Sequence, residues 1–383
     1  HPMSILDSIR DFFTPAKPLP AGVLHFQSPE DDELPYRLHL RMHGDGSSLL
    51  VVNAATVLHL NPTATEYAYH FIKGTSSVEA ASAVAKRYRV KKEQALQDYH
   101  LFSERIESLV HSEDLDPVSY LGFERISPHS AGLTAPLRLD CALTYALPKG
   151  ATADDAPTKR VDRELATAEW TSIIDKAWGA GIPHITFTGG EPTLREDLPE
   201  LIAYAEAKGM VSGLLSDGLA CADIDYLNTL LQTGLDHLLF ILHPENERSW
   251  QALDVILPED LHTTVHLTIN EENAANVPDI IERLGNLEIN ALSLSASPDH
   301  DEILQFAQEQ AANKGVSLTW DLPVPYSANH PVALETTEEH VPEGAGKVWL
   351  YVEPDGDVLP MQGMSDKILG NFLRDDWSDI WKN

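Results

Sequence analysis

Cysteine is scarce in this sequence, which has only Cys141 and Cys221 among its 383 residues. Two thiols form at most one disulfide, which excludes a disulfide-stapled secreted domain and is typical of a reducing compartment. Cys141 falls within a predicted strand, where we expect it to pack as a small apolar side chain. Cys221 follows a predicted turn, a position open to solvent.

Long apolar runs and basic residues are also lacking. No run approaches the roughly 18 apolar residues that a membrane span requires, and the start Met3–Asp7 lacks the basic-then-apolar order of a signal peptide. We therefore expect a cytoplasmic protein without a membrane span. The 27 basic residues against 59 acidic ones give a formal net charge of −32. Such a surface repels nucleic acid and anionic lipid. It favours a basic peptide or protein partner, or it serves solubility alone.

The first third of the chain contains two kinds of pattern. Residues 4–34 read as an amphipathic helix, with its apolar face over 4–13, and a proline-containing linker. Within residues 35–112, short alternating runs at 36–40, 48–52 and 57–60 predict antiparallel strands, followed by helical periodicity. Asn61-Pro62 opens the helical region, and Thr75 or Ser76 suits a helix N-cap. These features predict a small α+β domain.

A linker over 113–136 precedes a region, 137–330, in which strands and helices alternate. Amphipathic helices such as Thr167–Trp178 separate the runs. The strands that we expect are Leu137–Leu143, His184–Thr188, Val211–Ser216, His237–Leu242, Thr264–Ile269, Ala291–Ala296 and Ser317–Trp320. Repeated βα units predict an α/β fold with a parallel sheet covered by helices, in the form of an open or partial barrel. Ligands of such folds bind at the carboxyl ends of the strands.

The motif Thr188-Gly189-Gly190-Glu191-Pro192 directly follows one of these strands. Glycines at that place let the backbone pass close to a small ligand, and the carboxylate suits an amine. The segment resembles the Gly-Gly-Glu-Pro motif of radical SAM enzymes, in which the glutamate holds the amino group of S-adenosylmethionine. The resemblance implies a partial (β/α)6-type parallel barrel.

Two further segments are similar to that family. Ser216-Asp217-Gly218 resembles its Thr-Asn-Gly after the third strand, and Thr268-Ile269-Asn270 resembles the end of the fifth strand near the SAM ribose. The resemblance therefore implies remnants of a SAM pocket at Thr188, Gly189, Gly190, Glu191, Pro192, Ser216, Asp217, Thr268 and Asn270.

The cluster ligands of the family are absent. Counted from Tyr145, the three cysteine positions fall on Leu147, Ala151 and Asp154. Leucine and alanine have no donor atom, and the oxygen of Asp154 suits hard cations better than an iron–sulfide core. A 4Fe–4S cluster is normally held by thiolates, and two cysteines cannot make three ligands. We therefore expect no 4Fe–4S cluster.

Both ends of the chain resemble one branch of the family. Residues 35–112 are similar to the PqqD-like peptide-recognition domain, a winged-helix-like α+β unit, which implies a peptide groove at Leu49, Leu50, Val51 and Val52. Residues 331–383 are similar to the SPASM or twitch region, a short C-terminal extension. Glu343 and Met361 stand there at auxiliary-cluster cysteine positions.

Histidines form the remaining candidate site. His262 and His266 are four residues apart at a strand start, and His237 and His243 bracket another strand. Such spacing is consistent with a metal site but is more typical of partly buried structural histidines. We expect no metal ion and no catalytic residue.

The pattern as a whole favours a non-catalytic pseudoenzyme that binds a peptide or a partner protein through the PqqD-like domain. We expect no cofactor, and weak SAM binding or none, because chelation by the cluster is lost. One alternative is an enzyme of another class that reuses the SAM pocket for non-radical chemistry. Another is a soluble α/β protein whose motifs have lost any role.

Overall fold

The protein is described by a computed structural model, which covers residues 17–29, 32, 35–53, 56–110, 133–149, 161–297, 299–318 and 344–382. The chain divides into two compact units, His1–Ser127 and Pro128–Asn383. The predicted helix at 4–13 and the predicted cluster positions Ala151, Asp154 and Glu343 lie outside the described residues.

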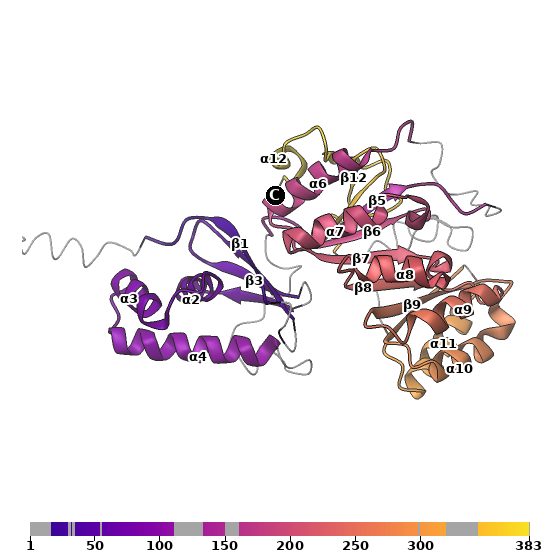
Figure 1. The fold of residues 1–383 in the computed structure, drawn as a ribbon, viewed down its shortest axis with the longest axis horizontal. Helices are drawn as coiled ribbons and strands as arrows, with labels where there is room; N and C mark the ends of the chain where they lie inside the picture. Colours follow the sequence, from indigo (N-terminus) through magenta and orange to yellow (C-terminus); the bar gives the residue numbers. More distant parts are fainter. Residues whose placement is uncertain are drawn as a thin grey trace, which may run out of the picture. The chain divides into compact units, whose positions relative to one another are not determined.

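The first unit packs helices on an antiparallel sheet (Figure 1). Its strands are β1 Gly22–Gln27, β2 Arg37–Met42, β3 Ser48–Val52 and β4 Thr56–Leu60, and its helices are α2 Pro62–Ile72, α3 Ser77–Tyr88 and α4 Lys92–Val110. The predicted cap residues start α2 and α3. Asn61 accepts a hydrogen bond from the Ala64 N–H at 2.9 Å, and Ser76 accepts one from the Glu79 N–H at 3.4 Å. One sheet face and the helices share an apolar core that includes Leu40, Leu50 and Phe102.

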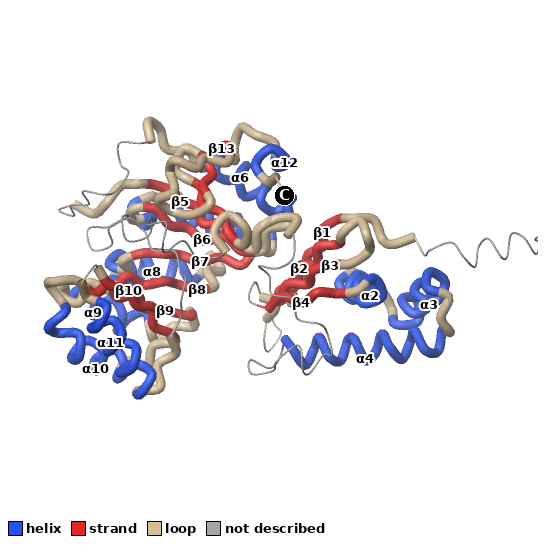
Figure 2. The backbone as a smooth tube through the Cα atoms, turned by 180° about the vertical axis from the view of Figure 1, so that it is seen from behind, coloured by secondary structure: helices blue, strands red, loops and turns tan. Residues whose placement is uncertain are grey.

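The sheet order β1-β2-β3-β4 corrects two predictions (Figure 2). Residues 22–27 form β1, although we predicted linker there. The predicted groove strand, Leu49–Val52, is an interior strand, because β3 is hydrogen-bonded to β2 on one side and to β4 on the other. Its backbone therefore has no free edge for a peptide. The outer strands of this sheet are β1 and β4.

The second unit is built on a nine-stranded sheet in the order β10-β9-β8-β7-β6-β5-β11-β12-β13. Six strands, β5 to β10, are parallel, and helices connect them. These strands are β5 Arg138–Thr144, β6 His184–Gly189, β7 Val211–Ser216, β8 His237–Ile241, β9 His262–Ile269 and β10 Ala291–Ala296. The helices between and after them are α6 Thr167–Ala180, α7 Leu198–Lys208, α8 Ile224–Leu231, α9 Glu247–Ile256, α10 Val277–Asn286 and α11 Asp301–Asn313. The prediction of a parallel α/β sheet is confirmed. Of the predicted strand Ser317–Trp320, the described residues show a single bridge, between Leu292 and Leu318.

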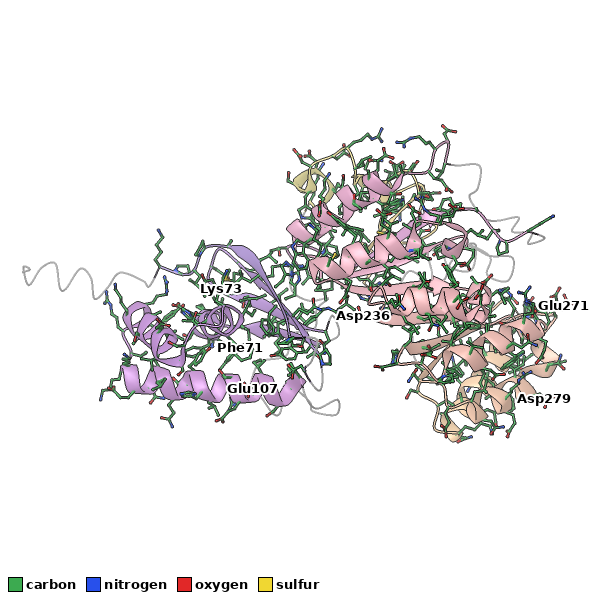
Figure 3. All side chains as sticks on the ribbon, viewed as in Figure 1. Phe71, Lys73, Glu107, Asp236, Glu271 and Asp279 are labelled. Carbon is green, nitrogen blue, oxygen red and sulfur yellow. The ribbon has the colours of Figure 1, made fainter. Side chains whose placement is uncertain are left out.

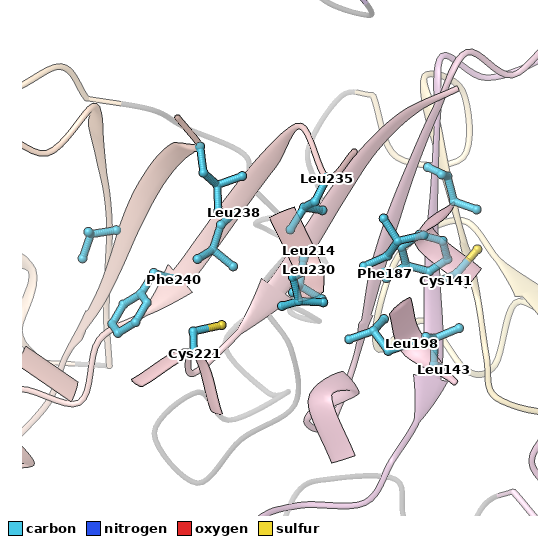
Figure 4. Close-up of a cluster of buried hydrophobic side chains, with 14 of the residues drawn as sticks. Cys141, Leu143, Phe187, Leu198, Leu214, Cys221, Leu230, Leu235, Leu238 and Phe240 are labelled. Atoms are coloured by element: carbon cyan, nitrogen blue, oxygen red, sulfur yellow. The ribbon is translucent and has the colours of Figure 1, made fainter. Parts of the chain in front are cut away.

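Helices cover one face of this sheet and bury its main core. Alternate strand residues such as Leu139, Phe187 and Leu267 point into that core, so their neighbours point to the opposite face. Cys141 is fully buried in the core, as predicted, and Cys221 is also buried, at 1 % exposure (Figure 4). An exposed position for Cys221 is therefore wrong, because the turn that carries it folds under the helices.

The C-terminal segment joins the sheet. Strand β11 Trp349–Val352 pairs in parallel with β5, and β12 Asp357–Leu359 and β13 Gly370–Asn371 follow antiparallel. Helix α12 Trp377–Ile380 is the last helix or strand of the described part. The described residues of the predicted extension 331–383 are therefore integral to the second unit, because β11 pairs directly with β5.

Lys176 on α6 forms hydrogen bonds with this C-terminal segment. Its ammonium group donates hydrogen bonds to the carbonyl oxygens of Phe372 at 2.6 Å and Asp375 at 2.7 Å. We expect Lys176→Met to lower the free energy of unfolding by about 2 kcal/mol, because hydrogen bonds to charged groups are among the stronger ones. Urea unfolding measures this change. Lys208→Met is the control, because Lys208 is paired with Asp175 at the surface and such pairs contribute little. An equal loss in both variants would contradict the role of Lys176.

Acidic side chains such as Glu271 and Asp279 lie at the surface of the second unit (Figure 3). In the described part of the chain, no helix combines the length and apolar character needed to cross a membrane.

Candidate functional site

The candidate site lies where the parallel strands β5, β6, β7 and β8 end. Carboxyl ends of neighbouring parallel strands meet at one edge of a sheet. Here that edge carries Ala146 after β5, Glu191 after β6, Asp217 after β7 and His243 after β8. The sequence analysis predicted Glu191 and Asp217 for this place.

The two glycines of the motif are required by the neighbouring strand. A Cβ on Gly189 would lie 2.1 Å from the Thr144 carbonyl oxygen, and one on Gly190 would lie 2.2 Å from that of Ala146. The Gly190 N–H donates to the Thr144 carbonyl at 2.7 Å, and the Glu191 N–H donates to the Ala146 carbonyl at 2.8 Å. The prediction that the glycines leave room for a ligand is thus corrected, because the backbone after β5 occupies that room.

This backbone pairing places the Glu191 carboxylate inside the protein, at 4 % exposure. Its Oε1 accepts hydrogen bonds from the Thr193 N–H at 3.1 Å, the Thr193 hydroxyl at 2.6 Å and the Ser216 hydroxyl at 2.7 Å. Its Oε2 accepts one from the Asp217 N–H at 2.9 Å. The structure thus joins Glu191, Ser216 and Asp217, and it adds Thr193, which the sequence analysis missed. Thr193 follows Glu191 by two positions, a spacing typical of a side chain that caps a turn.

Burial raises the pKa of both carboxylates. Burial, together with the negative charge of Asp217, raises the pKa of Glu191 to about 7. Burial also raises the pKa of Asp217, while the nearby His243 acts in the opposite direction. Like charges in a desolvated site disfavour double ionisation. Glu191 therefore titrates near neutral pH.

Thr188 adds a second polar feature at this edge. Its side chain is fully buried, and its hydroxyl oxygen has no hydrogen-bond partner among the described residues. Alternation along β6 places it on the face opposite to Phe187, away from the helix-covered core. An unsatisfied buried hydroxyl is costly, so Thr188 is a polar group at this edge whose hydrogen bond the described residues do not supply.

Thr268 and Asn270 are not joined to this group. They lie at the end of β9, and β7 and β8 separate β9 from β6. Thr268 is hydrogen-bonded to Ser295 and His266 at 3.2 Å, and Asn270 caps the turn that follows β9. Of the described auxiliary and cluster positions, Leu147 is half-buried and Met361 is buried at 8 % exposure.

A buried hydrogen-bond network lies beside the end of β5, and the sequence analysis did not predict it. The Tyr145 hydroxyl donates to Glu353 at 2.9 Å and lies 3.4 Å from the Tyr351 hydroxyl. Both partners are more than 200 residues away in the chain, so no local pattern indicates these contacts. A cavity of about 250 Å³ lies at the turn between β11 and β12, with the lining residues Asp162, Arg163, Asp355, Asp357, Asn371, Leu373 and Arg374.

The histidines occupy two places on the face opposite to the helices. His184 and His237, at the starts of β6 and β8, form a hydrogen bond of 2.7 Å between their Nε2 atoms. His266 is buried and bonds Ser293 at 2.9 Å and Ser295 at 3.1 Å. His262 is exposed. His266 is therefore a buried residue with hydrogen bonds to serines, which fits the structural role that its spacing suggested. The contact of His184 with His237 was not predicted.

Comparison with known proteins gives relatives at low identity, and no protein-family profile matches the chain. The PqqA peptide cyclase of Methylobacterium sp. (strain 4-46) is 27 % identical over 289 residues, which is 66 % of this chain and 74 % of the relative. The PqqA peptide cyclase of Gluconobacter oxydans (strain 621H) is 26 % identical over 282 residues, or 64 % of this chain and 76 % of the relative.

Solved structures show the same fold. Streptococcus suis SuiB bound to S-adenosylmethionine superposes with a TM-score of 0.60 at 13 % identity, over 94 % of this chain and 88 % of SuiB. SuiB bound to its precursor peptide SuiA gives the same score at 12 % identity, over 94 % of this chain and 89 % of SuiB. The chain therefore has an α/β fold with a parallel sheet similar to that of radical SAM enzymes. The matches support the resemblance to that family.

These matches overturn the prediction of a non-catalytic pseudoenzyme. The matched relatives are named as enzymes, peptide cyclases, and this indicates an enzyme. The prediction of no cofactor is contradicted in the same way. Peptide cyclase relatives and a SAM-bound structural neighbour point to SAM and a 4Fe–4S cluster.

The thiols of this chain do not fit a cluster held by three cysteines. The sequence has two cysteines, and both side chains are buried in the apolar core, where burial raises the pKa of each thiol. A cluster is held by deprotonated thiolates, which burial in an apolar core disfavours. The described thiols therefore do not supply the ligands of such a cluster.

Proposed function

We propose that this chain is a peptide-modifying enzyme that binds S-adenosylmethionine at the carboxyl edge of its parallel sheet. The support comes from the relatives named PqqA peptide cyclase and from the SuiB structures with SAM and with precursor peptide SuiA. The observation that carries the proposal is the buried Glu191 carboxylate, which four hydrogen bonds hold at the place where ligands of such folds bind.

The residues of the chain have separable tasks in this proposal. Oε2 of Glu191 accepts one hydrogen bond from protein, which leaves a lone pair for the ammonium group of SAM. The Ser216 and Thr193 hydroxyls orient the carboxylate, and burial excludes water from it. SAM, when bound, supplies a group activated for transfer by its sulfonium. Charge-assisted hydrogen bonds of this kind are stronger than neutral ones.

The N-terminal unit is proposed to take the peptide, as a PqqD-like recognition domain over 35–112. An extended peptide adds to a sheet through a free strand edge, and in this sheet β1 and β4 are the outer strands. The formal net charge of −32 favours a basic peptide. We also propose that the second unit is a partial (β/α)6-type barrel, and that residues 331–383 correspond to the twitch-like region.

Glu191→Gln tests the proposal. We expect calorimetric titration at pH 8 to show SAM binding weakened about 30-fold in the variant, because a charged hydrogen bond is lost. Wild-type affinity should rise between pH 6 and pH 8, since Glu191 loses its proton near pH 7 and the ionised form binds the ammonium. Glu200→Gln is the control, because Glu200 lies on the outer face of α7.

A second readout concerns the reaction. A short peptide encoded next to this protein should change mass when incubated with wild-type protein and SAM, and the change should be lost with Glu191→Gln. No SAM binding at any pH would refute the proposal. SAM binding without a modified peptide would leave the ligand site and refute the assigned reaction for that peptide.

A further inference from the structure

Within the described part of the chain, the Glu191–Asp217 pair has no lysine or arginine partner, and His243 is the basic side chain that acts on Asp217. Asp197, by contrast, is paired with Arg195. Buried charge without compensation is destabilising. The group that neutralises this pair is thus expected to arrive with the ligand.

The two carboxylates differ in the number of hydrogen bonds that they already accept from the protein. Glu191 already accepts four hydrogen bonds, and its geometry is held by Thr193 and Ser216. Asp217 is only half-buried, and its Oδ1 accepts one bond, from the Leu219 N–H at 2.9 Å. The hydroxyl of Thr188, whose hydrogen bond the described residues do not supply, lies at the same edge. A ligand therefore meets one fixed carboxylate, a second carboxylate next to it, and a neutral hydroxyl.

Resting on the proposed function, we infer that Asp217 determines charge specificity at this site: it favours the sulfonium of S-adenosylmethionine over the neutral thioether of S-adenosylhomocysteine. The two ligands share the ammonium, carboxylate and adenosine groups, so the interactions of Glu191 are the same for both. They differ by one methyl group and one positive charge. A second carboxylate beside Glu191 gains Coulomb energy with the sulfonium alone. The other titratable groups that face the pair are His243, Cys221 and Tyr226, and none of them supplies a negative charge at neutral pH.

Asp217→Asn tests the inference, because the amide oxygen keeps the bond to the Leu219 N–H while the charge is lost. Calorimetry with SAM and with S-adenosylhomocysteine at pH 8 gives the ratio of the two affinities. We expect the variant to lower the preference for SAM about tenfold, mainly through weaker SAM binding. Asp225→Asn is the matched control, since it removes an exposed charge on α8 nearby, and it should leave the ratio unchanged.

Each outcome is decisive. An unchanged ratio in Asp217→Asn, with SAM still bound, would overturn the inference and leave the proposed function standing. No SAM binding by the wild-type protein would overturn both. Thermal unfolding shows whether the variant is folded, and Asp217→Ser, which retains a hydroxyl acceptor for Leu219, replaces it if it is not.

Discussion

Replacing Gly190 with alanine is expected to lower the free energy of unfolding of the second unit by about 3 kcal/mol. The added Cβ would lie 2.2 Å from the Ala146 carbonyl oxygen and 2.9 Å from the Tyr145 carbonyl carbon. Both contacts are with backbone atoms, which no side-chain rotation relieves. The motif must move away from β5, and the bonds of Gly190 and Glu191 to Thr144 and Ala146 break.

Urea unfolding followed by tryptophan fluorescence measures this loss, because all seven tryptophans lie within Pro128–Asn383. Gly179→Ala is the control. Its Cβ meets no atom within 4 Å, and alanine within α6 should stabilise the protein by up to about 1 kcal/mol. Glu191 depends on the same backbone, so Gly190→Ala is also expected to weaken SAM binding. A midpoint equal to that of the wild type would show that the close approach to Ala146 is absent in solution.

Acid is expected to destabilise the second unit through the partly buried pair of His184 and His237. Burial, with smaller contributions from His262 and Arg138, lowers the pKa of His237 to about 4. Burial also lowers the pKa of His184, which is hydrogen-bonded to it. A histidine with a lowered pKa in the fold stabilises the protein above its unfolded pKa of 6.5. That contribution is lost as the pH falls through 4. For His237 it amounts to about 3 kcal/mol.

His237→Gln tests this assignment, because glutamine retains a hydrogen bond to His184 and cannot take up a proton. The wild type should lose more stability than the variant between pH 7 and pH 4, with tryptophan fluorescence again as the probe. His100→Gln serves as the control, since His100 is exposed on α4 of the first unit, whereas the histidine pair belongs to the second. If the wild type and His237→Gln lost stability in parallel, other groups would account for the acid sensitivity.

The predictability of this fold differs between its two units. Val211–Ser216 and Ala291–Ala296 were predicted to the residue, because buried parallel strands read as short apolar runs between amphipathic helices. Gly22–Gln27 was missed, since a strand at the edge of a sheet carries little of that pattern. Leu49–Val52 has no free edge because β3 pairs with β2 on one side and with β4 on the other.

In the candidate site too, some residues could be predicted from the sequence and others could not. Glu191 and Asp217 were identified from motifs, because each motif lies within a few residues of the end of a strand. The bond from the Ser216 hydroxyl to Glu191 and the contact of Tyr145 with Glu353 join distant segments. No local sequence pattern predicts these two contacts. The function was inferred wrongly from missing cysteines, since relatives that share most of the chain are named as enzymes.

By itself, the sequence determined the parallel α/β architecture, the acidic surface, the number of thiols and the position of Glu191 after a strand. These depend on composition and on hydrophobic period, which are local properties of the chain. The tertiary structure alone decided that both thiols are buried and that the glycines fit against the backbone after β5. It also decided that β11 pairs with β5, and that Glu191 and Asp217 share a site at which no described lysine or arginine pairs with them. Each of these depends on which distant segments pack together, because burial and charge coupling are set by neighbours in space.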